Sequence, residues 1–115
     1  MKINTDKISR ERIQNCHNGT GGIIFREIFS EIDFDSSLEH FHETIIEPHA
    51  TIGYHQHTGN EEVYYIVEGR GKMTLNGKEV EVEPGDAIIT QNGDSHGLSN
   101  TSDSEMRILV FQCKC

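Results

Sequence analysis

The stretch from His55 to Gly69, HQHTGNEEVYYIVEG, combines a His-x-His pair, two adjacent glutamates and a run of β-forming residues. The run from Glu62 to Val67 is rich in Val, Ile and Tyr, which favour strands, and it ends at a glycine. Side chains two residues apart on a strand point to the same face, so His55 and His57 are expected side by side. The stretch therefore predicts two strands, joined by a short glycine-containing turn, with two imidazoles on one face.

Similar short runs, separated by glycine, proline or asparagine, recur from Gly21 onward. Asn76-Gly77 predicts a tight hairpin turn, because both residues tolerate a positive φ. Many short strands at near-regular spacing, without a long helix, indicate an all-β sandwich or barrel. The segment 5–14 is predicted to be a short helix or an arm. The expected strands are residues 23–29, 41–46, 51–57, 62–67, 72–75, 78–82, 87–90 and 107–112.

Length and charge narrow the classes of protein. A chain of 115 residues fits one domain, and its formal net charge of -9 makes nucleic acid and anionic lipid poor partners. No apolar run approaches the length of a bilayer span, and the start lacks the apolar stretch of a signal peptide. Three cysteines form no disulfide framework, so reduced thiols in a cytoplasm are expected. The closing Cys113-Lys114-Cys115 is either a soft-metal site or simply exposed.

Two imidazoles on an inward face are costly unless a partner satisfies both, and a divalent metal does so. Glu62, at the start of the next strand, could return a carboxylate beside the two rings. His96, expected in a loop after Gly93, could close the site from a distant strand. Three imidazoles and one carboxylate suit Zn, Fe, Mn, Ni or Co. A solvated surface pair is the alternative for an isolated His-x-His.

Two motifs carry a resemblance to a known family. His-x-His at His55, then four residues, Glu62, six residues and Gly69, resembles the first cupin motif. The glycine that usually opens this motif is absent, and His49 stands there. This departure concerns the bend into the strand rather than the ligands.

The stretch from Gly85 to Asn100 resembles the second cupin motif, with Gln91 in the place of its usual proline. Gly93 and His96 stand at the other positions of that motif. Fifteen residues, 70–84, separate the two motifs, a spacing typical of small microbial cupins.

The resemblance implies an all-β fold, the double-stranded β-helix or jelly-roll barrel of a small single-domain cupin. Residues 1–20 would form an N-terminal arm or extra strand, and residues 21–115 the barrel domain. By resemblance, the metal ligands are His55, His57, Glu62 and His96, and the cofactor is a divalent transition metal, Zn, Fe, Mn or Ni. Small cupins usually form homodimers, which we also expect here.

The leading functional hypothesis is a metal-dependent enzyme that acts on a small polar or acidic molecule, with dioxygenase-like or decarboxylase-like activity. The alternative is a non-catalytic, metal-loaded module that binds or senses a small ligand. A structural metal site in an inactive protein is a third hypothesis. Polar side chains within reach of the open side of the metal would favour the enzyme.

If the strand is regular, Thr51 and Gly53 share the inward face of His55, and His49 does so too. His49 is then a proton shuttle or a rim histidine, and a bulge would reverse its direction.

Arg26 is expected either to hold a substrate carboxylate or to pair with a surface glutamate. Tyr64 would share the face of the ligand carboxylate and either bind substrate or fill the barrel. Gln91 would donate to a ligand or cap a turn. His40 and His42 are predicted at the surface or a sheet edge, with a second metal site as the alternative.

Overall fold

The computed structural model describes all 115 residues, and it is built almost entirely of strands. Three short 3-10 turns are the only helices, and none has the length or the hydropathy that crossing a membrane requires. The elements are η1 (Thr5–Lys7), β1 (Glu11–Gln14), η2 (Cys16–Asn18), β2 (Gly22–Ser30), η3 (Glu31–Asp33), β3 (Leu38–Ile46), β4 (Thr51–Gln56), β5 (Asn60–Glu68), β6 (Gly71–Leu75), β7 (Lys78–Val82), β8 (Ala87–Thr90), β9 (Ser95–Asn100) and β10 (Met106–Lys114).

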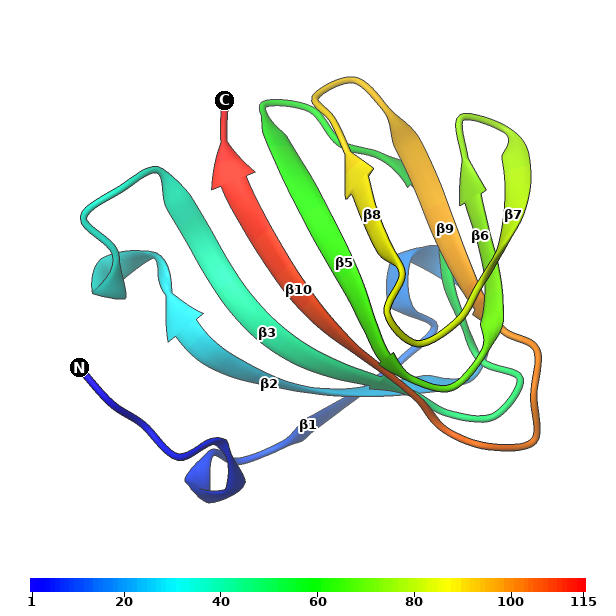
Figure 1. Cartoon of the computed structure of the whole chain (residues 1–115), viewed down its shortest axis with the longest axis horizontal. Coiled ribbons are helices and arrows are strands. Elements are labelled where there is room, and N and C mark those ends of the chain that lie inside the picture. The colour runs from blue at the N-terminus through cyan, green and yellow to red at the C-terminus, as the bar shows by residue number, and fades with distance from the viewer.

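Two antiparallel sheets face each other (Figure 1). The larger sheet has the order β1-β2-β3-β10-β5-β8, and the smaller has the order β4-β9-β6-β7. The chain passes between the sheets six times, because β4, β5, β6, β8, β9 and β10 each lie in a different sheet from the strand before them. This is the jelly-roll arrangement, and the predicted all-β cupin-type fold is confirmed.

The inner face of the larger sheet changes from polar to apolar along its strands. Strand pairing places residues from neighbouring strands in rows across this face. The rows, from the polar end onward, are His40, Gln112, Glu62 and Thr90; His42, Val110, Tyr64 and Ile88; Phe25, Thr44, Ile108 and Ile66; and Ile23, Ile46 and Met106. The sheet therefore carries a polar site at one end and a hydrophobic core at the other.

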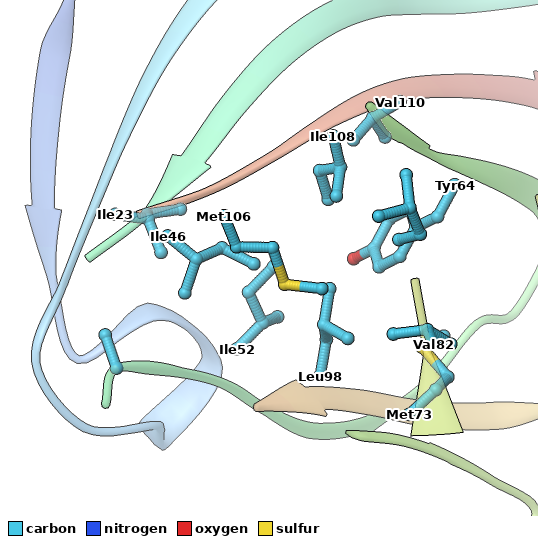
Figure 2. Packing of buried hydrophobic residues seen from close by; sticks show 12 residues of the cluster. Ile23, Ile46, Ile52, Tyr64, Met73, Val82, Leu98, Met106, Ile108 and Val110 are labelled. Carbon is cyan, nitrogen blue, oxygen red and sulfur yellow. The ribbon is translucent and has the colours of Figure 1, made fainter. Parts of the chain in front are cut away.

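The hydrophobic core fills the space between the two sheets at the apolar end. Twelve buried residues form a single cluster, and Figure 2 shows Ile46 and Met106 of the larger sheet opposite Ile52 and Leu98 of the smaller. Burying such side chains supplies about 25 cal/mol for each Å² of apolar surface removed from water. The core therefore fixes the distance between the sheets and with it the separation of side chains at the polar end.

Two strands differ from the sequence expectation. The segment 5–14 contains a 3-10 turn and an edge strand, β1, which pairs with β2. His96 lies in strand β9, between β4 and β6, and not in a loop as expected. The sequence of β9, Ser-His-Gly-Leu-Ser-Asn, has few strand-forming residues, so tertiary pairing and not propensity determines its conformation.

Asn100 joins the turns at the apolar end of the two sheets. This buried side chain donates through Nδ2 to the carbonyls of Ile46, Glu47 and Ser104 at 3.0, 3.2 and 2.7 Å. Its Oδ1 accepts from the backbone N–H and the hydroxyl of Ser102. One amide thus satisfies carbonyl groups of both the β3–β4 and the β9–β10 connections.

We expect Asn100→Asp to lower the free energy of unfolding by about 2–4 kcal/mol, because a carboxylate of the same size cannot donate to buried carbonyls. Ser102→Ala is the matched control, since it removes one hydroxyl of the same network and should cost about 1 kcal/mol or less. Urea unfolding followed by circular dichroism measures both. Equal stability of Asn100→Asp and the wild-type chain would contradict this role.

Candidate metal centre

Four side chains meet at the polar end of the space between the sheets. His55 on β4 and His96 on β9 are cross-strand partners in the smaller sheet, and Glu62 on β5 faces them from the larger sheet. His57 follows the end of β4. His57 Nε2 lies 3.0 Å from His96 Nε2, and Glu62 Oε1 lies 3.3 Å from each of these nitrogens.

Hydrogen bonds on the far side of each ring aim the Nε2 atoms at one point. His55 Nδ1 donates to the Gly53 carbonyl at 2.7 Å, and His57 Nδ1 donates to Asn60 Oδ1 at 2.6 Å. His96 Nδ1 lies 2.7 Å from the Thr90 hydroxyl. Because carbonyl oxygens only accept, the Nδ1 atoms of His55 and His57 carry protons, and in the neutral rings Nε2 keeps its lone pair. Such outer partners are what metal-binding histidines require.

The inward-facing atoms have no adequate partner in the protein. Glu62 Oε1 is buried and makes no hydrogen bond, although two imidazole nitrogens lie next to it. An unpaired buried carboxylate oxygen is costly, and a cation would offset that cost. Ligands held about 2.0–2.2 Å from one ion are separated by roughly 2.8–3.6 Å. The distances among Glu62 Oε1, His57 Nε2 and His96 Nε2 fit this range, and the ligand nitrogen of His55 lies within 4.8 Å of those of the other two histidines. The residues therefore fit a divalent metal.

The protonation states of these side chains at neutral pH favour metal binding. Burial lowers the pKa of His55 to about 4, so its ring is neutral. Burial alone would raise the pKa of Glu62, but contacts with His40, His57 and His96 together hold the pKa of this carboxyl well below its usual range. Contact with Glu62 raises the pKa of His57, so this is the ring at which a proton competes most with a metal.

A bulge in β4 sets the direction of the histidines. Ile52 pairs with Leu98 and His55 pairs with His96, so Gly53 and Tyr54 together oppose Gly97. The alternation of side chains between the inner and outer faces is therefore reversed before the bulge, so that Ile52 faces inward instead of Thr51. The expectation for a regular strand is wrong for this reason. His49 is exposed, has a φ of 60° and lies 2.6 Å from Asp103, and it does not line the site.

A short segment, residues 15–19, lies against β4 and is called the strap here. His17 on the strap stacks on His55 with ring centroids 3.7 Å apart. Three strap residues other than glycine, Asn15, His17 and Asn18, have positive φ, a conformation that costs about 1 kcal/mol or more for each. Nothing in the sequence pattern predicted this stack.

Close contact between backbones makes the stack possible. A Cβ atom at Gly53 would overlap the His17 carbonyl oxygen and lie 2.8 Å from Gly19 N, and one at Gly19 would overlap the Thr51 carbonyl oxygen. The pair of glycines therefore lets the strap lie directly on β4, which seats the His17 ring on His55.

Arg26 does not reach the site. It lies opposite Glu43 on the outer face of the larger sheet, where its Nε donates to Glu43 Oε1 at 2.9 Å. Its Nη1 donates to the Thr5 carbonyl at 2.6 Å, and the side chain is 5% exposed. Of the two expectations for Arg26, pairing with a glutamate is confirmed, but the pair lies beneath the N-terminal residues and not at the surface.

His40 and His42 line the site, so their predicted surface placement is wrong. Their rings stack at 4.1 Å, and His40 Nε2 lies 3.8 Å from Glu62 Oε2. Both follow the inner-face alternation of β3, which places them in the rows of Glu62 and Tyr64. Tyr64 is buried beside His96.

Gln91 is exposed, and its backbone N–H donates to Asp94 in the turn before β9, in agreement with the turn-cap reading. Cys113 lies 3.1 Å from the Ser37 hydroxyl, and Cys115 is exposed. These three residues therefore take no part in the site. Cys16, on the strap, is half-buried and does line it.

A cavity of about 510 Å³ opens beside the donors. Its polar wall includes His40, His42, Asn60 and Gln112, and the strap contributes Cys16 and His17. No lysine or arginine lines the cavity, and Glu62 is its one carboxylate. The cavity therefore offers no permanently charged side chain to an anionic ligand, and a bound metal would supply such a charge.

We expect Gly53→Ala to push the strap off β4 and to destabilise the chain by about 1–3 kcal/mol. Amide hydrogen exchange of residues 15–19 should accelerate, because the strap loses its contact with the sheet. Tyr54→Ala, at the neighbouring exposed position, is the control and should leave that exchange unchanged. Unchanged exchange in Gly53→Ala would contradict the role of the glycine contact.

Known proteins resemble this chain over its whole length. The oxalate-binding protein of Thermotoga maritima is 31% identical over 110 residues, 96% of this chain and 91% of that protein. The crystal structure of a predicted oxalate decarboxylase from Thermotoga maritima has 30% identity and a TM-score of 0.97, and the match covers 100% of both chains. The polyketide cyclase RemF from Streptomyces resistomycificus, 22% identical with a TM-score of 0.81 over 98% of this chain and 78% of that one, shares the fold. Residues 38–112 match the Cupin domain, and the chain belongs to the cupin family.

Proposed function

We propose that the chain is a divalent-metal-dependent enzyme whose substrate is a small carboxylic acid. The observation that carries the metal is the buried Glu62 Oε1, which has no hydrogen-bond partner and faces two Nε2 atoms. We assign the ligand role to His55, His57, Glu62 and His96, and the cofactor to Zn, Fe, Mn or Ni. The Nδ1 partners Gly53, Asn60 and Thr90 support this assignment because they fix the rings.

Some residues of the chain would hold the metal, and others would act on the substrate. When bound, a divalent metal supplies Lewis-acid chemistry or, if it is Fe or Mn, redox chemistry. His40 and Gln112 lie in the same row as Glu62 and present polar groups to the cavity. The His40 imidazole can donate to a substrate oxygen or move a proton, whereas the Gln112 amide can only form hydrogen bonds and already donates to Glu39. Ile52, Ile23 and Val110 exclude water from the far side.

Similarity to two proteins of Thermotoga maritima supports a small carboxylic acid as the substrate. One relative is named an oxalate-binding protein, and one solved structure is titled a predicted oxalate decarboxylase. The absence of lysine and arginine from the cavity also favours a substrate whose carboxylate meets the metal itself. We therefore infer decarboxylase-like chemistry first and dioxygenase-like chemistry second.

A binding or sensing module is the second candidate. The name of the Thermotoga relative, a binding protein, favours it, as does the cavity, which offers no carboxylate besides the buried Glu62 as a general base. The imidazole of His40 favours the enzyme, because a module that only stores a ligand has no need of a group that moves protons. Cytoplasmic location belongs to both candidates and is supported by three free cysteines.

We also propose a homodimer formed through the outer face of the larger sheet. A row of apolar side chains crosses four adjacent strands on this face: Phe41, Phe111, Val63 and Ile89. Phe41 and Phe111 stack at 4.4 Å, and Tyr65 and Val67 extend the row. A continuous apolar stripe on a chain this small is typical of an interface, and two copies related by a twofold axis would bury it.

His57→Ala should lower metal affinity by at least about 100-fold and abolish the stabilisation that added Zn²⁺ or Mn²⁺ gives the wild-type chain. Glu62→Gln should weaken binding as well, because the charge is lost while the shape is kept. The control is His49→Ala, whose ring is exposed, contacts Asp103 and does not line the cavity. Elemental analysis and thermal unfolding with and without metal measure these effects. Normal metal content in His57→Ala would overturn the ligand assignment.

Turnover separates the two candidate functions. The metal-loaded chain is incubated with oxalate and with 2-oxo acids while CO₂ release and oxygen uptake are recorded. Product formation that disappears in His57→Ala supports the enzyme. Tight binding of these acids without turnover supports the binding module instead.

Phe111→Glu should shift the chain from dimer to monomer in sedimentation velocity, because a charge would be buried at the centre of the interface. Val80→Glu, an exposed apolar position on the smaller sheet, is the control and should leave the sedimentation coefficient unchanged. A monomeric wild-type chain would disprove the proposed dimer.

A further inference from the structure

The cavity is larger than an oxalate-sized ligand requires. Its volume of about 510 Å³ could hold roughly seventeen water molecules at about 30 Å³ each, whereas oxalate has six non-hydrogen atoms. Pockets of about 300–1,000 Å³ typically enclose ligands of drug size. A ligand that only chelates the metal would leave most of the space filled with water.

The space beyond the donors has one apolar wall, next to His42 and Thr44 in the same rows. Val110 and Phe25 occupy the next rows of the inner face beyond Glu62, and Ile23 follows at the far end. Ile13 on β1 pairs with Ile23 and faces the same space, and Ile52 faces it from the smaller sheet. Water against such a wall is readily displaced by apolar groups. The wall therefore favours a ligand with an apolar body.

A second carboxylate on the ligand would find no lysine or arginine to pair with in the cavity. None of the lining residues is lysine or arginine, and Arg26 lies paired with Glu43 on the opposite face of the sheet. A carboxylate moved into the apolar half would lose its hydration without an ionic partner. The cavity thus discriminates by charge as well as by size, against ligands with an acid at the distal end.

We propose that the site selects a 2-oxo monocarboxylic acid with an alkyl or aryl body. Its carboxylate and adjacent oxygen lie at the donors, and its body packs against Phe25, Ile23 and Ile13. This inference rests on the proposed function, since the chelating end requires the metal. It places the substrate among amphipathic acids larger than oxalate.

Three ligands that share one chelating end test the proposal: pyruvate, 4-methyl-2-oxopentanoate and 2-oxoglutarate. Beyond this end, pyruvate carries no further group, 4-methyl-2-oxopentanoate carries an apolar branch and 2-oxoglutarate carries a second carboxylate. Each is titrated by calorimetry into the chain loaded with Mn²⁺, and metal content is measured in the same samples. We expect 4-methyl-2-oxopentanoate to bind at least about tenfold more tightly than pyruvate, and 2-oxoglutarate no more tightly than pyruvate.

Two variants, Phe25→Ala and Ile13→Arg, test which side chains determine the preference among the ligands. Phe25→Ala should reduce the preference for 4-methyl-2-oxopentanoate over pyruvate about fivefold, whereas Phe29→Ala, the same truncation on the outer face of β2, should not. Ile13→Arg introduces a cation and should raise affinity for 2-oxoglutarate. Thermal unfolding verifies that each variant is folded, and Ile13→Arg gives an independent readout if Phe25→Ala is unfolded.

The outcomes separate this inference from the proposed function. A wild-type chain that binds no metal overturns the proposed function and removes the basis of the inference. Normal metal content with equal affinity for pyruvate and 4-methyl-2-oxopentanoate overturns the inference alone. So does tighter binding of 2-oxoglutarate, or a preference that Phe29→Ala changes as much as Phe25→Ala does.

Discussion

The polar end of this molecule depends on one buried oxygen atom, Glu62 Oε1. It projects from the larger sheet toward two imidazole nitrogens of the smaller sheet and accepts no hydrogen bond there. A carboxylate in this position draws the two sheets together only when a cation lies between them. The apolar core at the other end sets the spacing of the two sheets, and with it the distance from Glu62 to the imidazole nitrogens.

The alternation of strands explains how one sheet serves both stability and chemistry. A single inner face carries Glu62 and, two rows further along, Ile66 and Ile108, which are fully buried. The outer face of the same sheet carries the Arg26–Glu43 pair and the apolar row of Phe41 and Phe111. The strands of the larger sheet thus supply core, site and surface together, and only His57 and the strap contribute to the site from outside the strands.

Local signals in the sequence predicted the all-β architecture, and resemblance to the cupin motifs singled out His55, His57, Glu62 and His96 as proposed ligands. The His-x-His pair, the Asn76-Gly77 turn and the strand of Glu62 are all readable from nearest neighbours. The rest depends on contacts between distant residues. The bulge at Gly53 reversed the expected face of Thr51, β9 formed from residues with little strand propensity, and the inward placement of His40 followed from register alone. The stack of His17 on His55 joins residues that no local pattern connects.

The contact between the strap and β4 links two parts of the chain that lie far apart in sequence. Gly53 has no room for a side chain while the His17 carbonyl rests on it, and the family match begins only at residue 38. In evolution, therefore, position 53 and the strap are expected to covary. A relative that carries a bulkier residue at the position of Gly53 must hold its own N-terminal segment further from the sheet, and the ring beside its first histidine would then differ.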